Sequence, residues 1–156
     1  MFPEPEDDYD RKVIANIETY GWHVVIVPED DEGAGFAYTV GLTYSYGHAE
    51  IILFGLPQDV THAVLNETGD RAKSGTRIAA NTYVEGLLEG YDCGFVTVHK
   101  TQYREYLGQC RWLYGGNEFD ALQCVWPDMC GLFPWDEGFP ESLRIKQPNL
   151  GRGYAE

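Results

Sequence analysis

The apolar positions of this chain recur with two periods, and the period of three to four residues marks three helices. In the first of them, Tyr9, Val13, Ile17 and Tyr20 share one face, and Gly21 supplies the stop. Asp7 or Asp8 is placed to cap its first turn. The predicted helices cover residues 9–20, a segment from 57 to between 69 and 75, and residues 101–114.

Short runs of β-branched and aromatic residues, closed by glycine or proline, mark the strands. The first three runs follow one another through short connections, which favours an antiparallel meander. The next two flank Gly90-Tyr91-Asp92 and predict a second hairpin. The predicted strands cover residues 22–27, 36–40, 50–54, 83–89, 93–99 and 119–126.

These elements predict an α+β fold: a single domain with a mostly antiparallel sheet of about five or six strands and about three helices packed on it. A chain of 156 residues can bury a core of its own. We expect a flexible acidic N-terminus over residues 1–10, the domain over 11–140, and a C-terminal tail over 141–156. After Pro127, prolines interrupt the periodic pattern, and the aromatic residues there are expected to wrap the sheet or line a cleft.

The charge is strongly unbalanced, with 25 Asp and Glu residues against 11 Lys and Arg residues and a formal net charge of −14. Such a field repels phosphate backbones and anionic lipids, so we expect neither nucleic acid nor a membrane as partner. A basic protein surface would be attracted instead. The alternative is that the charge only keeps the protein in solution.

The cysteines and glycines do not form a recognisable metal or cofactor motif. Cys93, Cys110, Cys124 and Cys130 lack Cys-x-x-Cys spacing, and no charged and apolar signal segment precedes them. We therefore expect reduced thiols, a cytoplasmic location, no metal and no cofactor. Gly33-Ala34-Gly35 begins like a dinucleotide-binding loop, but Tyr38 occupies the place of the third glycine.

The most informative stretch is residues 35–55, where two apolar runs enclose a polar and aromatic turn. If His48 and Glu50 share a strand, they face the same side, where the carboxylate can orient the imidazole. His48 would then be a catalytic acid or base, and Tyr38, Thr39 and Tyr44 would line a binding pocket. The alternative is structural, with His48 closing a tight turn and Glu50 accepting from nearby amides.

Two further groups are candidates for binding. His23 heads the first predicted strand, and if it lay near His48 and Glu50 the three would resemble a facial metal triad. Trp126, Asp128 and Trp135 combine aromatic rings with a carboxylate, which suits a protein or cationic ligand. The alternative for these aromatic residues is packing onto their own sheet.

An ordered series of short motifs carries a family resemblance over about residues 12–140. The motifs are Gly21-Trp22-His23-Val24, Gly35 to Leu42, Gly47-His48-Ala49-Glu50, Phe54-Gly55-Leu56-Pro57, Gly86 to Tyr91, Tyr114-Gly115-Gly116, Gln123 to Asp128 and Phe133-Pro134-Trp135. In this order they resemble the bacterial domain of unknown function numbered 4262. The resemblance implies that His48, Glu50, Tyr38, Thr39 and Trp126 belong to the family motif, and it assigns them no roles.

Two functions from different classes follow. The first is an acidic interaction module, for example an immunity-type protein, that binds a basic protein partner or toxin. The second is a small enzyme, for example a hydrolase, with its pocket around Tyr38, Thr39, His48 and Glu50. The sequence leaves the oligomeric state open.

Overall fold

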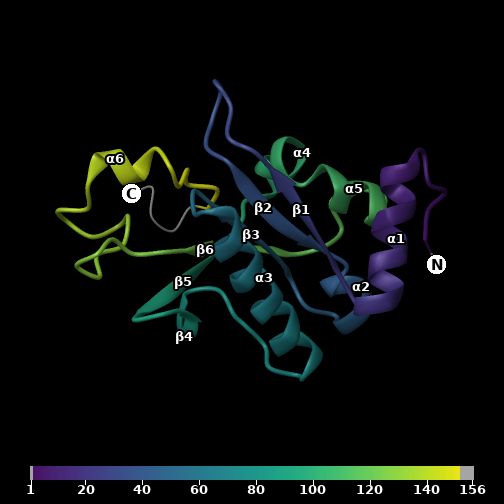
Figure 1. Cartoon of the computed structure of the whole chain (residues 1–156), viewed down its shortest axis with the longest axis horizontal. Helices are drawn as coiled ribbons and strands as arrows, with labels where there is room; N and C mark the ends of the chain where they lie inside the picture. The colour runs from purple at the N-terminus through teal and green to yellow at the C-terminus, as the bar shows by residue number, and fades with distance from the viewer. Residues whose placement is uncertain (1, 152–156) are drawn as a thin grey trace.

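A computed structural model describes residues 2–151, which form one six-stranded sheet with helices on both faces (Figure 1). The strand order is β1-β2-β3-β6-β5-β4, and only the central β3–β6 pair is parallel. The predicted α+β fold with a mostly antiparallel sheet is confirmed. The strands are β1 (His23–Val27), β2 (Phe36–Val40), β3 (Glu50–Phe54), β4 (Thr82–Leu88), β5 (Tyr91–Thr97) and β6 (Ala121–Val125).

Three α-helices of the described chain have seven or more residues, and short helices lie between and after them. The longer helices are α1 (Asp8–Tyr20), α3 (Gln58–Lys73) and α5 (Gly108–Tyr114). The short helices are α2 (Leu42–Tyr46), the 3-10 turn η1 (Lys100–Gln102), α4 (Tyr103–Tyr106) and α6 (Glu141–Arg144).

The first helix begins and ends as its sequence predicts. The Asp7 side chain caps it by accepting from the Asp10 amide at 2.9 Å. Gly21 ends it with a φ of 100°, a left-handed conformation that side chains disfavour. Val13 and Ile17 are buried, so the predicted apolar face is the one that packs.

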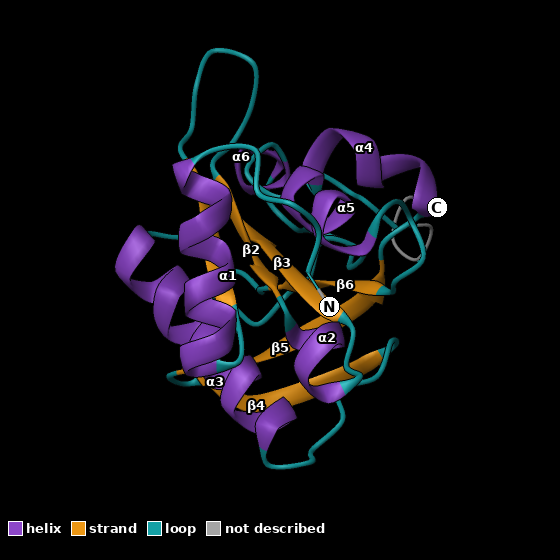
Figure 2. Ribbon diagram, turned by 90° about the vertical axis from the view of Figure 1, so that its right-hand side faces the viewer, coloured by secondary structure: helices purple, strands orange, loops and turns teal. Residues whose placement is uncertain are grey.

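The sheet divides the core into two layers, which Figure 2 shows as helices on opposite sides of the strands. On one face α4 and α5, together with the buried side of α1, cover Val25, Tyr38 and Ile52. On the other face α3 covers Ile51 and Leu53. β3 lies in the middle of the sheet and is buried along its whole length, which explains its continuous apolar run.

Two elements differ from the sequence prediction. The expected turn after β2 contains the five-residue helix α2. The expected single helix over residues 101–114 is divided into η1, α4 and α5, because Leu107 leaves helical geometry at φ −117° and ψ 42° while its side chain is completely buried.

Both ends of the described chain make more contacts than their composition suggests. Phe2 stacks on Tyr44 with ring centroids 4.5 Å apart, and α1 already begins at Asp8. Gln147 and Leu150 are each only 2% exposed, so the expected tail packs on the domain as far as residue 151. The last five residues of that predicted tail, 152–156, lie outside the described residues. Within residues 2–151, every helix is too short or too polar to cross a bilayer.

Candidate functional site

Glu50 is the centre of the predicted site, and its carboxylate is completely buried at the first residue of β3. It accepts hydrogen bonds from three consecutive backbone amides at the start of α2, those of Gly41 at 3.0 Å, Leu42 at 3.2 Å and Thr43 at 3.2 Å. The hydroxyl groups of Thr39, at 2.8 Å, and Tyr114 also donate to it. Glu50 therefore caps α2 from a neighbouring strand.

Burial and hydrogen bonding act in opposite directions on this carboxyl group. Burial raises the pKa of Glu50 above its ordinary value, and the bonds from Tyr114, Thr39 and the α2 amides oppose that rise because they favour the ionised form. All five partners donate in this arrangement, and three of them are backbone amides, which can only donate. The group is held as a hydrogen-bond acceptor with no capacity left over for a ligand.

His48 is sealed in as well, but it does not bond to Glu50. The His48 side chain, in a residue 2% exposed, pairs through Nδ1 with the Ala49 carbonyl at 2.8 Å, and its Nε2 accepts from the Ile78 amide at 3.0 Å. A carbonyl only accepts, so Nδ1 carries the proton and the ring is neutral. The predicted His48–Glu50 pairing is therefore wrong: β3 begins at Glu50, His48 precedes it in a loop, and the shared strand face does not exist.

The other residues of the predicted pocket are mostly structural neighbours of this cluster. Thr39 is completely buried, and Tyr38, 3% exposed, accepts from the Gln109 amide at 3.1 Å through its hydroxyl. Burial raises the pKa of Tyr38 well above its ordinary value. Tyr44 is exposed, and its backbone amide donates to the Tyr114 hydroxyl at 3.2 Å. The structure brings these residues together, and His48 also lines a groove of about 870 Å³ that Arg77 and Phe119 border.

His23 has partners of its own, away from His48 and Glu50. Its two ring nitrogens pair with the Tyr9 hydroxyl and the Asn16 amide, each at 2.9 Å. The three side chains imagined as a facial triad do not meet, and within residues 2–151 no three His, Cys, Asp or Glu side chains are grouped as metal ligands.

The aromatic segment after β6 packs against the sheet. Trp126 is 6% exposed and donates from Nε1 to the Phe54 carbonyl at 2.7 Å. Asp128 closes the following turn by accepting from the amides of Cys130 at 2.9 Å and Leu132 at 2.8 Å. These contacts agree with the packing alternative for Trp126 and Asp128.

Trp135 differs from Trp126 because it is only partly buried. Its ring stacks on Phe133 with centroids 5.2 Å apart, and its Nε1 donates to the hydroxyl of Tyr83, an exposed residue of the edge strand β4. Trp135 is thus the member of the predicted binding group that still presents aromatic surface to solvent.

The comparison with known protein families agrees with the series of motifs. The sequence profile of the family described as Domain of unknown function (DUF4262) matches residues 16–140. The chain belongs to the DUF4262 family. The match begins inside α1 and covers all six strands, so this DUF4262 domain contains the complete sheet and the Glu50 cluster. No curated protein and no solved structure matches the chain.

Sequence reasoning missed one feature of this DUF4262 protein, a groove of about 830 Å³ between α1 and α3. Of its lining residues, His23 is the one that the sequence predicts as a binding residue. Lys12 and Asn16 of α1 and His62 and Asn66 of α3 share the lining, at helical spacings of four. That polar spacing is a signal that the sequence contains, but no local pattern shows that α1 and α3, which are separated by three strands and α2, lie along the same strand.

Proposed function

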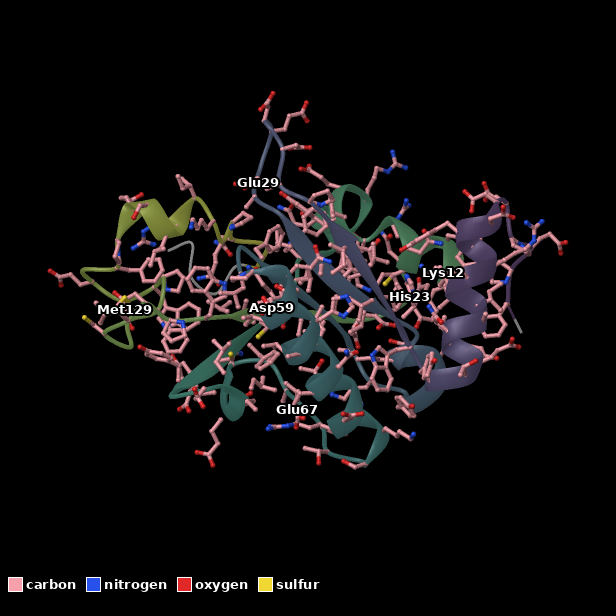
Figure 3. All side chains as sticks on the ribbon, viewed as in Figure 1. Lys12, His23, Glu29, Asp59, Glu67 and Met129 are labelled. Atoms are coloured by element: carbon pink, nitrogen blue, oxygen red, sulfur yellow. The ribbon has the colours of Figure 1, made fainter. Side chains whose placement is uncertain are left out.

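We propose that this protein is an acidic interaction module of the cytoplasm that binds a basic protein surface, for example that of a toxin. The observation that carries the proposal is the acidic tip, residues 29–32 (Glu-Asp-Asp-Glu), on the loop between β1 and β2. The loop projects beyond the sheet, and carboxylate oxygens gather at its end, with Glu29 labelled near its base (Figure 3).

The acidic tip has a defined shape because one of its carboxylates is used internally. The Asp30 side chain accepts from the amides of Glu32 at 2.9 Å and Gly33 at 3.1 Å, and the Asp30 amide donates to the Gly33 carbonyl at 3.1 Å. Glu29, Asp31 and Glu32 are exposed, and none of them forms an ion pair within the described part of the chain. The backbone that carries these three carboxylates is therefore held in one turn before a partner binds.

Three carboxylates on a projecting loop suit a partner whose surface is rich in lysine or arginine. The formal charge of −14 adds long-range attraction toward such a surface, which speeds association at low ionic strength. The small-enzyme alternative gains less support. His48 borders a groove of about 870 Å³, but the polar atoms of Tyr38, Thr39, His48 and Glu50 are engaged in hydrogen bonds within the protein.

The test compares two variants of equal net charge. In the tip variant, Glu29→Gln, Asp31→Asn and Glu32→Gln remove the acidic tip. In the control, Glu85→Gln, Glu89→Gln and Asp92→Asn remove three exposed carboxylates of the β4–β5 hairpin. Wild-type protein and both variants are immobilised and exposed to a cell extract, retained proteins are identified, and association rates are measured at low and high salt.

We expect a basic protein to bind wild type and the control variant, with association to the tip variant slower by on the order of tenfold at low salt. High salt should reduce this difference, since the Debye length falls to about 3 Å at 1 M. Equal losses in the two variants would assign binding to net charge alone. A retained partner that is acidic, or binding that ignores salt, would refute the proposal.

A further inference from the structure

The groove between α1 and α3 has more basic than acidic side chains in its lining, whereas the molecule as a whole is strongly acidic. Its floor is the edge strand β1, with Val24 and Ile26, and its walls are the polar faces of the two helices. Lys12 on α1 and His23 on β1 lie next to each other in Figure 3. This region is open to solvent, unlike the sealed Glu50 cluster.

Lysines are concentrated in this groove although the chain is acidic. Two of the four lysines of the sequence, Lys12 and Lys73, line it, and neither is engaged in an ion pair within residues 2–151. Asp70 is the only carboxylate of the lining. Other carboxylates of the two helices, such as Asp8 one turn before Lys12 and Asp59 one turn before His62, lie outside this lining. Charges farther away are screened beyond the Debye length of about 8 Å at physiological ionic strength.

The hydrogen bonds of His23 turn its end of the groove into a set of donors. The Asn16 amide nitrogen donates to Nδ1, so Nε2 carries the ring proton and donates to the Tyr9 oxygen. The Tyr9 hydroxyl hydrogen then has no acceptor within the described chain and is available to a ligand. His23 itself is 7% exposed, so the arrangement is built into the floor rather than formed by mobile surface side chains.

Burial and the charges around His23 favour its neutral form, as its hydrogen bonds require. Burial, with smaller contributions from the nearby Lys12 and His62, lowers the pKa of His23 to about 4. These two residues are therefore close enough to oppose a positive charge on the ring. A bound negative charge would offset all three effects. Tyr9 is the other titratable residue in contact with the His23 ring. Asp70 and Lys73 line the same groove from the last turns of α3.

We propose that the His23 end of the groove binds the anionic group, phosphate or carboxylate, of a small organic ligand. Lys12 provides the charge, and the Tyr9 hydroxyl and His62 provide further donors. The rest of the ligand extends toward Trp22, whose indole is fixed by a 3.1 Å bond from Nε1 to the Asn66 side-chain oxygen. The amide nitrogen of Asn66 is left available, since it makes no bond within residues 2–151.

The experiment titrates the full chain with phenyl phosphate, benzoate and the uncharged benzyl alcohol while the imidazole resonances of His23 and His62 are followed by NMR. The first two probes distinguish phosphate from carboxylate, and the third measures binding of the ring alone. Lys12→Met removes the proposed charge from an exposed position, and Lys146→Met removes one lysine outside the groove as a matched control.

We expect at least one anionic probe to bind more tightly than benzyl alcohol and to raise the pKa of His23 from its low starting value. Lys12→Met should weaken that binding by on the order of tenfold, as expected for one charge-assisted hydrogen bond, and Lys146→Met should leave it unchanged. Equal binding of all three probes, an unchanged His23 pKa, or wild-type affinity in Lys12→Met would each overturn the proposal. Failure here leaves the acidic tip proposal untouched.

Discussion

At the scale of single residues, Glu50 explains why a five-residue helix exists at all. Isolated helices shorter than about 12 residues are marginal in water, because nucleation is costly. Of the amides at the start of α2 that lack partners within the helix, those of Gly41, Leu42 and Thr43 donate to Glu50, and that of Tyr44 donates to the Tyr114 hydroxyl. The carboxylate thereby satisfies the start of the helix and ties it to β3, while Tyr114 ties both to α5.

We expect Glu50→Gln to lower the free energy of unfolding by about 3 kcal/mol, because the new amide group would face two or more hydrogen-bond donors. Urea denaturation followed by circular dichroism measures this change. Glu85→Gln, at an exposed position, serves as the control and should change it by less than about 0.5 kcal/mol. Wild-type stability in Glu50→Gln would mean that the native carboxyl group is protonated.

The sequence revealed that His48 and Glu50 matter, but it could not reveal how. Their spacing of two predicts a shared face only if both lie on one strand, and the strand begins at Glu50. The partners that decide their roles are distant in the chain: Tyr114 is 64 residues from Glu50, and Ile78 is 30 residues from His48. Local pattern carries no information about contacts of that range.

At the scale of elements, the packing of α3 against Trp22 depends on a missing side chain. A Cβ atom on Gly69 would lie 2.4 Å from Cε2 of the Trp22 ring, so glycine lets the helix approach the indole closely. The same ring is held from α3 by Asn66, one turn earlier. Gly69 thus serves the contact between α3 and the chain entering β1, although it lowers helix propensity.

We expect Gly69→Ala to destabilise the protein by about 2 kcal/mol, even though alanine normally stabilises a helix interior by up to about 1 kcal/mol. Gly108→Ala is the matched control, because no atom lies within 4 Å of its added Cβ and its φ is not positive. Thermal unfolding of both variants would measure the difference. A gain in stability from Gly69→Ala would show that α3 can shift away from Trp22 without loss.

Strands and long helices could be predicted from the sequence where the local pattern and the final packing agree. The strand over residues 50–54 is predicted correctly because its short apolar run is closed by Gly55, and the structure buries that run along its whole length. The helix over 101–114 was predicted as continuous, since its apolar spacing is regular, yet Leu107 interrupts it to reach the core. Tertiary packing overrode propensity at that residue.

At the scale of the whole molecule, few of the carboxylates within residues 2–151 form ion pairs. The ion pairs among residues 2–151 are Arg11–Asp8, Arg71–Glu67 and Arg144–Glu141, each within one helical turn of sequence. Such short-range pairs do not reduce the repulsion between distant parts of the surface. A formal charge of −14 therefore opposes the compact state.

We expect added NaCl, from about 0.02 M to 0.2 M, to raise the midpoint of thermal unfolding because it screens this repulsion. A rise of about 3 °C would correspond to roughly 1 kcal/mol for a chain of this length. The variant without the acidic tip should show a smaller rise. A midpoint that is constant or decreases with salt, measured by calorimetry, would mean that self-repulsion does not limit stability.

The parallel pairing of β3 with β6 has a consequence for synthesis of the chain. β1, β2 and β3 are complete well before residues 121–125 leave the ribosome, so the first three-stranded half has to wait for the second. During that interval β3 is an unprotected outer strand whose five side chains are all destined for the interior. Such an edge attracts other chains, which makes the nascent first half the stage most exposed to aggregation.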